Sequence, residues 1–415
     1  MKLLPHQIKT IEKAMPILRE HGVVLLCAEC RCGKTPMALT MAKQLGDKIL
    51  FISKKKALGS IESDAKALGI DCVVINYESL HKCNFKPDLL ICDEIHALSA
   101  YAKPSKAAKA VREFALKAKF VIGLSATPAI EASSQWFHIF WSTGNRGPFK
   151  LFGSFYRWFK EFGISEKIKI AGGIEVETYK NVRPEVADHV TKYSVVVTQE
   201  DAGFLVAPKV VKHLIDAPDL VFLGSKIKRD GIIEIEGKTV LAEGPAAKLQ
   251  KMAMLCGGTL IDENEESFVF DGQAKLDFLL TKLRKGRRYA IFTAYIRERD
   301  LICDVLSGHG FRCGEDMDAL KNGELDCFVG SLKRFSEGVN LAWLTDGCMI
   351  LYSLNFSGTT FAQILNRQIR FDRVEPVNVQ VLLIRGSIEE KVFAAVSGKQ
   401  SFNEEFYRKV ENVGV

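Results

Sequence analysis

A phosphate-binding loop near the amino end is the feature that most constrains how this chain can fold. The segment Ala28-x4-Gly33-Lys34-Thr35 follows an apolar run, Val23–Ala28, and opens a stretch with helical periodicity, Lys34–Leu45. Such a loop needs a strand before it and a helix after it, because backbone N–H groups at the helix start must point at the phosphate oxygens. A short, wholly apolar strand is typical of a parallel sheet that is covered on both faces.

Apolar runs alternate with helical patterns through the first 144 residues. The further runs there are Ile49–Ser53, Cys72–Asn76, Leu89–Cys92 and Phe120–Leu124. The alternation resumes after residue 272. The runs there are Ala290–Thr293, Cys327–Gly330, Met349–Tyr352 and Val379–Ile384. Because such alternation is typical of parallel sheets, we predict an α/β protein with two parallel-sheet domains, residues 1–144 and 273–415.

Residues 145–272 interrupt this pattern and are predicted to form a linking or accessory region. Gly231–Gly237, with the flanking runs Val221–Leu223 and Thr239–Leu241, resembles small antiparallel strands. An aromatic-rich stretch lies earlier, between Phe152 and Phe159. Its rings either pack in a core or stack on nucleic-acid bases.

Composition narrows the class of protein. The chain is 47% hydrophobic and 26% charged, which is ordinary for a globular protein with real cores. No run of about 18 apolar residues occurs, so no transmembrane helix is expected, and the amphipathic start does not resemble a signal peptide. The net charge of +7 is a mild excess that would suit a polyanion.

The eleven cysteines are interpreted as buried free thiols, because most lie inside apolar runs. This usage indicates a reducing, cytoplasmic setting. Cys27, Cys30 and Cys32 flank the phosphate loop, but no second pair has the spacing of zinc ligands, so zinc is not expected.

Two motifs on the first domain carry candidate catalytic groups. Lys34 would reach the β- and γ-phosphates of a nucleoside triphosphate, and Thr35 would hold Mg²⁺. Asp93 and Glu94 follow an apolar strand next to the loop. A carboxylate at the carboxyl end of a parallel strand can hold Mg²⁺, so we assign Asp93 to the metal and Glu94 to the attacking water.

Two further motifs could link this site to the second domain. The segment Ser125-Ala126-Thr127-Pro128 follows a strand, and its hydroxyls could sense the phosphates. An ordinary turn before a helix would have the same sequence pattern. Gln363, Arg367 and Arg370 have spacings of four and three, which would place them on one helix face. Arginines in so apolar a segment need a polyanionic partner, and a triphosphate could supply it.

Taken together and in this order, the motifs resemble those of superfamily-two helicases and translocases. Leu4-Pro5-His6-Gln7 resembles their adenine-reading segment, and Glu337-Gly338-Val339-Asn340-Leu341 resembles the motif before the arginine pair. That second segment and Gly386–Lys391 look like the Swi/Snf type, and the small size looks like compact bacterial or phage-encoded members that remodel forks and branched DNA. The family's first glycine in the phosphate loop is replaced here by Ala28.

The resemblance implies two RecA-like lobes with an ATP site between them, ATP and Mg²⁺ as cofactors, and DNA as partner. It implies ATP contacts for Gln7, Gly33, Lys34, Thr35, Gly338 and Gln363. It implies coupling roles for His96, Ser125 and Thr127, and charge-stabilising roles for Arg367 and Arg370. Candidate DNA contacts are Lys54, Lys55, Lys56, Tyr77, Thr293 and Lys333, although the lysines could equally be a solvated helix start.

The sequence thus predicts an ATP-driven DNA translocase or helicase, and replication or recombination proteins are its candidate protein partners. Two alternatives stay open: an RNA helicase, and a nucleic-acid clamp that uses ATP only as a switch. Strand separation and simple tracking are not distinguished by these motifs.

Overall fold

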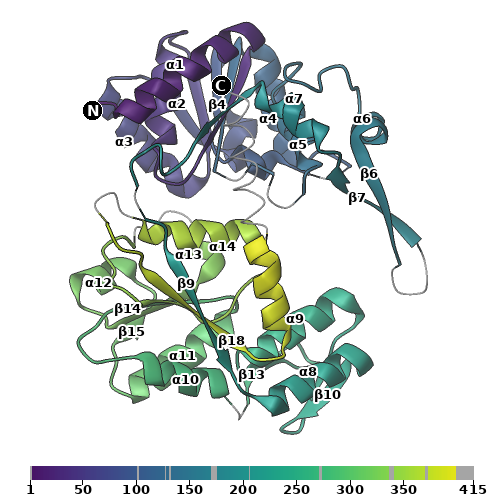
Figure 1. Ribbon diagram of the computed structural model, residues 1–415, viewed down its shortest axis with the longest axis vertical. Coiled ribbons are helices and arrows are strands. Elements are labelled where there is room, and N and C mark those ends of the chain that lie inside the picture. Colours follow the sequence, from purple (N-terminus) through teal and green to yellow (C-terminus); the bar gives the residue numbers. More distant parts are fainter. Residues whose placement is uncertain are drawn as a thin grey trace. The chain divides into compact units, whose positions relative to one another are not determined.

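The computed structural model describes residues 2–100, 102–126, 128–129, 132–169, 175–204, 206–270, 273–335, 341–369 and 373–398 of the 415-residue chain. These residues form two compact units, 2–203 and 204–398, and each unit contains a six-stranded sheet (Figure 1). All strand pairs within the two large sheets are parallel. The predicted α/β class is therefore confirmed, and the two sheets are consistent with two RecA-like lobes.

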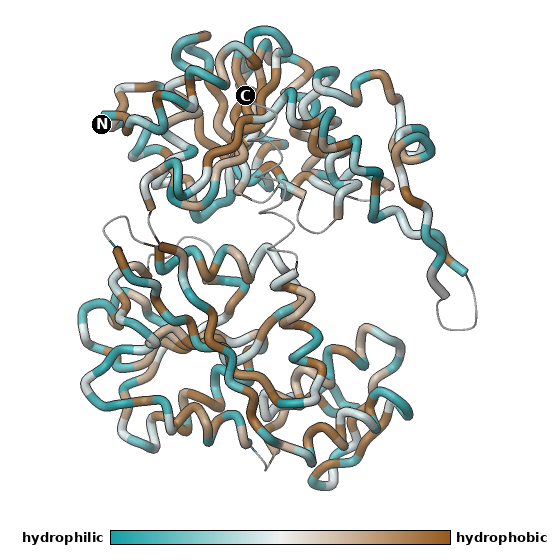
Figure 2. The backbone as a smooth tube through the Cα atoms, viewed as in Figure 1, coloured by the Kyte–Doolittle hydropathy of each residue, from teal (hydrophilic) through white to brown (hydrophobic). Residues whose placement is uncertain are grey.

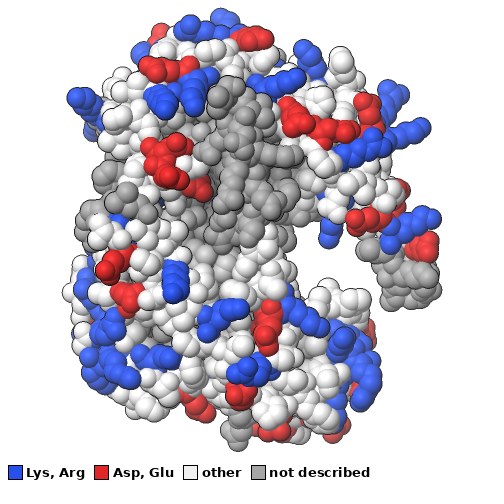
Figure 3. Space-filling view, viewed as in Figure 1, with Lys and Arg blue, Asp and Glu red and all other residues white. Residues whose placement is uncertain are grey.

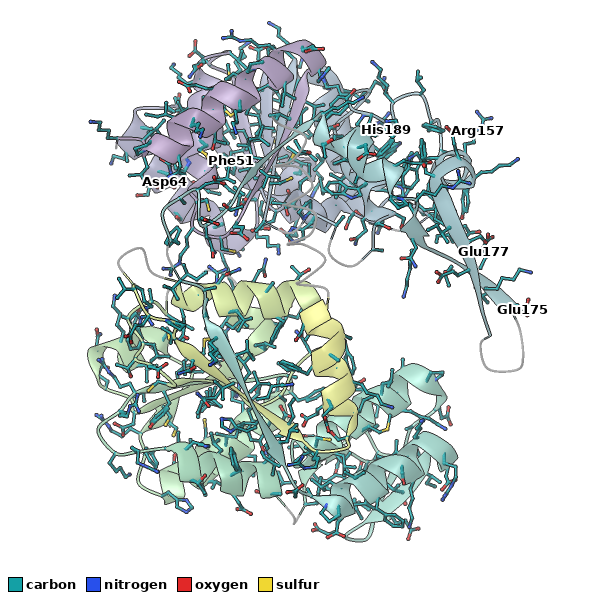
Figure 4. The ribbon with its side chains drawn as sticks, viewed as in Figure 1. Phe51, Asp64, Arg157, Glu175, Glu177 and His189 are labelled. Carbon is teal, nitrogen blue, oxygen red and sulfur yellow. The ribbon has the colours of Figure 1, made fainter. Side chains whose placement is uncertain are left out.

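The sheet of the first unit has the order β3-β2-β4-β5-β1-β8. Its strands are β1 (Val23–Ala28), β2 (Ile49–Ser53), β3 (Val73–Asn76), β4 (Leu89–Cys92), β5 (Phe120–Ser125) and β8 (Ser194–Val197). Every residue of β1, β2 and β4 is buried, as expected of strands with helices on both faces, and Phe51 of β2 points into this core (Figure 4). Because the strands are parallel, their carboxyl ends share one edge of the sheet.

Seven α-helices and three short 3₁₀ helices are described in the first unit. They are α1 (Pro5–His21), α2 (Lys34–Lys43), η1 (Lys55–Ala57), α3 (Leu58–Leu68), η2 (Tyr77–Lys82), η3 (Ile95–Leu98), α4 (Lys106–Lys117), α5 (Gln135–Ser142), α6 (Phe155–Phe162) and α7 (Glu185–Thr191). Proline at the first helical position begins α1, where its missing N–H costs nothing.

The sheet of the second unit has the order β15-β16-β14-β17-β18-β9. Its strands are β9 (Lys209–Ile215), β14 (Tyr289–Thr293), β15 (Cys313–Gly314), β16 (Cys327–Ser331), β17 (Met349–Leu351) and β18 (Asn378–Ile384). Hydrophobic segments of the tube lie inside this unit and hydrophilic ones outside (Figure 2). The labelled helices are α8 (Pro218–Asp230), α9 (Gly244–Cys256), α10 (Ala274–Lys282), α11 (Ile296–Gly308), α12 (Met317–Asn322), α13 (Leu332–Phe335), α14 (Gly358–Leu365) and η4 (Asn366–Gln368), and residues 388–398 are also helical.

The expected linking region, residues 145–272, is divided between the two units. Its first part adds α6, α7, β8 and the hairpin of β6 (Gly163–Lys169) and β7 (Glu175–Val182) to the first unit. This hairpin extends away from the large sheet, with Glu175 and Glu177 on its exposed surface (Figure 4). Its second part adds β9 and two small hairpins to the second unit. These hairpins pair β10 (Ile232–Ile235) with β11 (Lys238–Leu241), and β12 (Thr259–Ile261) with β13 (Ser267–Val269).

Two local predictions in this stretch have clear outcomes. The antiparallel strands near residue 235 are present, but Val221–Leu223 lies in helix α8 and not in a strand. Of the aromatic rings, Phe155, Trp158 and Phe159 are buried in the core of the first unit, which confirms the packing interpretation for these three.

All eleven cysteines are free thiols, but only six of them are buried as predicted. The other five are half-buried: Cys30, Cys72, Cys83, Cys303 and Cys313. No helix among the described residues is long and apolar enough to cross a membrane.

Candidate functional site: a phosphate loop beside paired carboxylates

The phosphate loop connects β1 to α2 at the carboxyl edge of the first sheet. Gly33 lies just before α2 with φ of 77°, a left-handed conformation that glycine adopts without steric cost. Lys34 turns back into the loop, where its Nζ donates to the carbonyls of Ala28 (2.9 Å) and Glu29 (3.4 Å). The first N–H groups of α2 have no partner within the helix and can therefore bind an anion.

The ammonium of Lys34 is held in its charged form. Burial by itself disfavours that charge, but Cys30, Glu94 and Asp93 oppose the effect, and the net result is a raised pKa of Lys34. A permanent cation therefore lies inside the loop, close to both carboxylates of the second motif.

The start of α1 contacts the loop directly. His6 Nε2 donates to the carbonyl of Cys32 at 3.0 Å, and Gln7 Oε1 accepts from the backbone N–H of Leu4 at 2.9 Å. A Cβ atom at Gly33 would come within 2.0 Å of Gln7 Nε2, so only glycine leaves room for this amide. The structure thus brings the predicted ATP contacts Gln7, Gly33 and Lys34 together.

Asp93 follows β4 and is fixed by three hydrogen bonds. Ser53 Oγ donates to its carboxylate at 2.6 Å, its own N–H donates to Ile52, and the Tyr77 hydroxyl donates to its carbonyl at 2.5 Å. Burial and the neighbouring Glu94 carboxylate raise the pKa of Asp93 to about 6, although Ser53 and Lys34 act in the opposite direction.

His96 joins the carboxylate motif to the next one. Its Nδ1 lies 2.9 Å from Ser125 Oγ and 3.1 Å from Glu94 Oε2. Glu94 has a left-handed backbone with φ of 49°, an uncommon conformation for a residue with a side chain. The predicted coupling residues His96 and Ser125 therefore meet beside Glu94, whereas Thr127 lies outside the described residues.

The donors at this edge of the sheet fit Mg²⁺. Asp93 and Glu94 place two half-buried carboxylates beside each other with Lys34 as a nearby cation, and a divalent ion would relieve their repulsion. Thr35 and Asp93 offer the hard oxygen ligands that Mg²⁺ prefers. In the described part of the chain, no cluster of three or more His, Cys, Asp or Glu could hold a metal. Phosphate and water would therefore have to complete the shell.

The segment after β8 also contacts the phosphate loop, which the sequence analysis did not foresee. Glu29 N–H donates to the Val197 carbonyl at 2.9 Å, and Glu29 Oε2 accepts from Gln199 N–H at 2.6 Å. Gln199 Nε2 donates to Cys30 at 3.2 Å, and the Cys32 thiol donates to Thr198 at 3.4 Å. These partners are about 170 residues apart along the chain, so no local pattern could reveal them.

Arg31 is a second residue that the motif analysis passed over. It occupies the middle of the loop with φ of 71°, in the left-handed region. A residue with a side chain costs roughly 1–2 kcal/mol more than glycine in this backbone conformation.

Some of the predicted DNA contacts are exposed at the surface, whereas others point into the protein. Lys55 and Lys56 are exposed at η1, directly after the carboxyl end of β2, and Lys333 is exposed on α13. Thr293, in contrast, is buried, and its hydroxyl donates to the Tyr295 carbonyl at 3.2 Å. The hydroxyl of Tyr77 is directed to Asp93, so both hydroxyls are already engaged inside the protein.

The expected helix face with Gln363, Arg367 and Arg370 does not form as one continuous helix. Helix α14 ends at Leu365, a 3₁₀ turn spans Asn366–Gln368, and Ile369 is extended with ψ of 138°. Gln363 is buried on α14 and Arg367 lies on the 3₁₀ turn. Arg370 and Gly338 lie outside the described residues.

Comparison with known proteins supports the resemblance. Residues 53–130, which include Asp93 and Ser125, match the family model described as "Type III restriction enzyme, res subunit". The chain is 22% identical over 418 residues to the human protein "DNA repair and recombination protein RAD54B", covering 86% of this chain and 45% of that protein. The mouse protein of the same name is 22% identical over 245 residues, covering 56% of this chain and 27% of that protein.

The chain spans less than half the length of these relatives. Their similarity, the matched family model and the two parallel sheets together support a protein that is similar to superfamily-two helicases of the Swi/Snf type.

Proposed function

We propose that this chain is an ATP-dependent DNA translocase or helicase. The observation that carries the proposal is the position of Asp93 and Glu94 directly after β4, a strand that only β5 separates from β1 and its phosphate loop. Ligands of parallel α/β sheets bind at the carboxyl ends of strands, and a carboxylate pair beside a phosphate loop is suited to nucleotide hydrolysis. The likeness to a protein named for DNA repair and recombination supports DNA as the nucleic acid.

In the proposed mechanism, Lys34 and the start of α2 bind the triphosphate, and Gln7 reads the base. Mg²⁺, held by Thr35 and Asp93, would neutralise charge on the phosphates. Glu94 orients the attacking water, and His96 reports the state of Glu94 to Ser125 through its 2.9 Å contact.

Arginines of the second unit would complete the reaction. We propose that Arg367 and Arg370 stabilise charge that develops during phosphoryl transfer, an effect worth roughly 10³–10⁵ in rate in enzymes that use such arginines. Binding and hydrolysis of ATP would then close and open the two units around one DNA strand. Lys54–Lys56 and Lys333 would contact phosphates, which gives action without sequence specificity.

The finer features of the function also belong to this proposal. The protein would act on forked or branched DNA, catalyse branch migration and work beside replication or recombination proteins. It would be a compact protein of the bacterial or phage type and would work in the cytoplasm. The predicted division into lobes 1–144 and 273–415 with a linking region 145–272 also belongs to this proposal, with the linking region divided between the two units described above.

The test is steady-state ATP hydrolysis without nucleic acid and with single-stranded, duplex, forked and four-way DNA and RNA, all at one salt concentration. We expect strong stimulation by DNA. Stronger stimulation by RNA would favour an RNA helicase, and absence of stimulation by any nucleic acid would contradict the motor function.

Lys34→Ala is the matching variant. We expect it to abolish hydrolysis and to leave DNA binding in place, because the hydrogen bonds that the structure describes for Lys34 go to the loop and not to the exposed lysines assigned to DNA. Lys43→Ala is the control, since Lys43 lies at the far end of α2 and pairs with Asp47 on the surface. Hydrolysis that persists in Lys34→Ala would refute the assigned site.

A further inference from the structure

A strongly basic segment connects α10 to β14 in the second unit. Residues 282–288 read Lys-Leu-Arg-Lys-Gly-Arg-Arg, so five of seven residues are cations and none is acidic. All five basic side chains are exposed. Among the described residues, none of the five forms an ion pair, although other cations of this unit do, such as Arg312 with Asp326.

Backbone carbonyls hold several of these cations in place. Lys285 Nζ donates to His309 at 2.9 Å, Arg287 Nη2 donates to Asp346 O at 2.6 Å, and Arg288 Nη1 donates to Lys321 O at 2.5 Å. A carbonyl orients a side chain without neutralising it. The charges are therefore positioned in advance, which lowers the entropy cost of binding a partner.

An aromatic wall and a small pocket lie beside the cations. The guanidinium of Arg288 is 5.2 Å from the centre of the Trp343 ring. Arg287, Arg288 and Trp343 line a pocket of about 180 Å³ together with Gly286, Leu344 and Thr345. The site thus presents two guanidinium groups at the mouth of a concave surface.

A purely structural role does not account for this much charge. Three helices, α10, α11 and α12, end near these cations, since Arg284 binds Thr281 O, Lys285 binds His309 O and Arg288 binds Leu320 O. Each helix end carries a partial charge of about −0.5. Three ends would balance about 1.5 of the five positive charges. The Asp326 carboxylate, which pairs with Arg312, also interacts with Lys285 and balances part of another charge, which leaves an excess of roughly three.

The segment also lies at the other end of β14 from the candidate DNA contact Thr293. It precedes Tyr289, the first residue of β14, whereas Thr293 ends that strand at the opposite edge of the sheet. Lys and Arg side chains gather on the face of the second unit that holds α10 and α12 (Figure 3). This surface is therefore separate from the strand contacts assigned above.

We propose that residues 282–288, with Trp343, form a second DNA-binding surface that holds phosphates of the duplex. This inference rests on the proposed function. Arginine forks match phosphate oxygens in a bidentate way, and repeated phosphates along a duplex can engage several unpaired cations at once. An acidic protein would need carboxylates at matching positions, whereas DNA offers an anion at every nucleotide.

The surface would extend the DNA site without touching the ATP chemistry. Its contacts are to phosphates, so they would add affinity for any sequence and strengthen the dependence of binding on salt. The expected consequence is a longer occluded site and a lower DNA concentration for half-maximal ATP hydrolysis.

The test is duplex-DNA binding over a salt series by the full chain with Lys282→Gln and Arg287→Gln combined. Removal of two phosphate contacts should lower the slope of log affinity against log salt by roughly two. The matched control is Lys226→Gln with Lys228→Gln on α8, since Lys226 stacks on Phe222 much as Lys282 stacks on Phe278. ATP hydrolysis without DNA should be unchanged in both variants.

If the double variant unfolds, Lys282→Gln alone serves as the test, because Lys282 caps no helix carbonyl among the described hydrogen bonds. For this single variant, the slope of log affinity against log salt should fall by roughly one. A slope equal to that of the wild type and the α8 control would overturn this inference. Failure of the proposed function is recognised separately, because it would appear as wild-type hydrolysis that no DNA stimulates. A variant that binds DNA normally but loses an acidic protein partner would also overturn it.

Discussion

The buried carboxylate Glu298 should make the stability of the second unit depend on pH near neutrality. Glu298 lies on α11 and is fully buried; its Oε2 accepts from Ser353 Oγ and from the Tyr295 N–H at 3.3 Å. Its Oε1 has no hydrogen-bond partner and lies against Gly257. Burial raises the pKa of Glu298 to about 7, because the opposing effects of Ser353 and Lys275 are smaller.

The raised pKa sets the sign and size of the effect. Below pH 4.5, the model value for Glu, the side chain is protonated in both the folded and the unfolded chain. Between pH 4.5 and about 7 the unfolded chain loses this proton first, so the free energy of unfolding falls by about 1.4 kcal/mol for each pH unit. Above pH 7 the loss levels off at about 3 kcal/mol.

The substitution Glu298→Gln removes the titrating carboxyl group and so isolates its contribution to the free energy of unfolding. That free energy is measured by urea unfolding from pH 4.5 to 8. The amide at the Oε1 position lacks a partner, which costs about 1–3 kcal/mol at every pH. Because this cost is the same at every pH, the test compares how steeply the free energy of unfolding falls with pH in the two proteins. We expect the wild type to lose about 3 kcal/mol more than Glu298→Gln between these pH values. Equal slopes for the two proteins would refute the assignment of a neutral, buried Glu298.

Three further predictions concern single contacts. Tyr77→Phe removes the hydroxyl that holds the Asp93 carbonyl and should slow ATP hydrolysis about tenfold while costing only about 1 kcal/mol of stability; steady-state kinetics and urea unfolding of the same sample test both parts. Arg31→Gly relieves the left-handed backbone and should raise the free energy of unfolding of the first unit by about 1 kcal/mol, and a decrease would contradict the strain argument. Gly257→Ala should destabilise by about 1–3 kcal/mol, since its Cβ would come within 1.9 Å of Glu298 Oε1; thermal unfolding measures the effect.

The strands that the sequence revealed are those whose burial is complete. Runs such as Val23–Ala28 and Leu89–Cys92 are apolar throughout because both faces of the sheet are covered, and their bounds in the structure agree with the prediction. The edge strands β8 and β9 were not predicted. Strand β9 has a mixed pattern of exposed and half-buried residues and is buried only at Ile215. It pairs with β18 about 170 residues later, so its role depends on a partner that no local window contains.

The residues of the candidate site also include some that the sequence reveals and others that it does not. Residues that belong to spaced motifs, such as Lys34, Asp93 and His96, could be named from the sequence because the chemistry restricts their identity and order. Their supports could not. Ser53 and Gln199 are ordinary polar residues at the ends of β2 and β8, and they gain meaning only when sheet order brings those ends to the loop and to β4.

Three unfavourable features lie around the phosphate loop, and their presence there has a physical logic. Arg31 and Glu94 have left-handed backbones, and Asp93 has a carboxyl group whose ionisation burial opposes. Each feature reduces the stability of the free protein, and each would be relieved or exploited once a triphosphate and a divalent cation share the site. The loop is also tied through Gln199 to the segment that leads into the second unit. A change of loop conformation on binding ATP would therefore act on that segment directly, in addition to the path through His96 and Ser125.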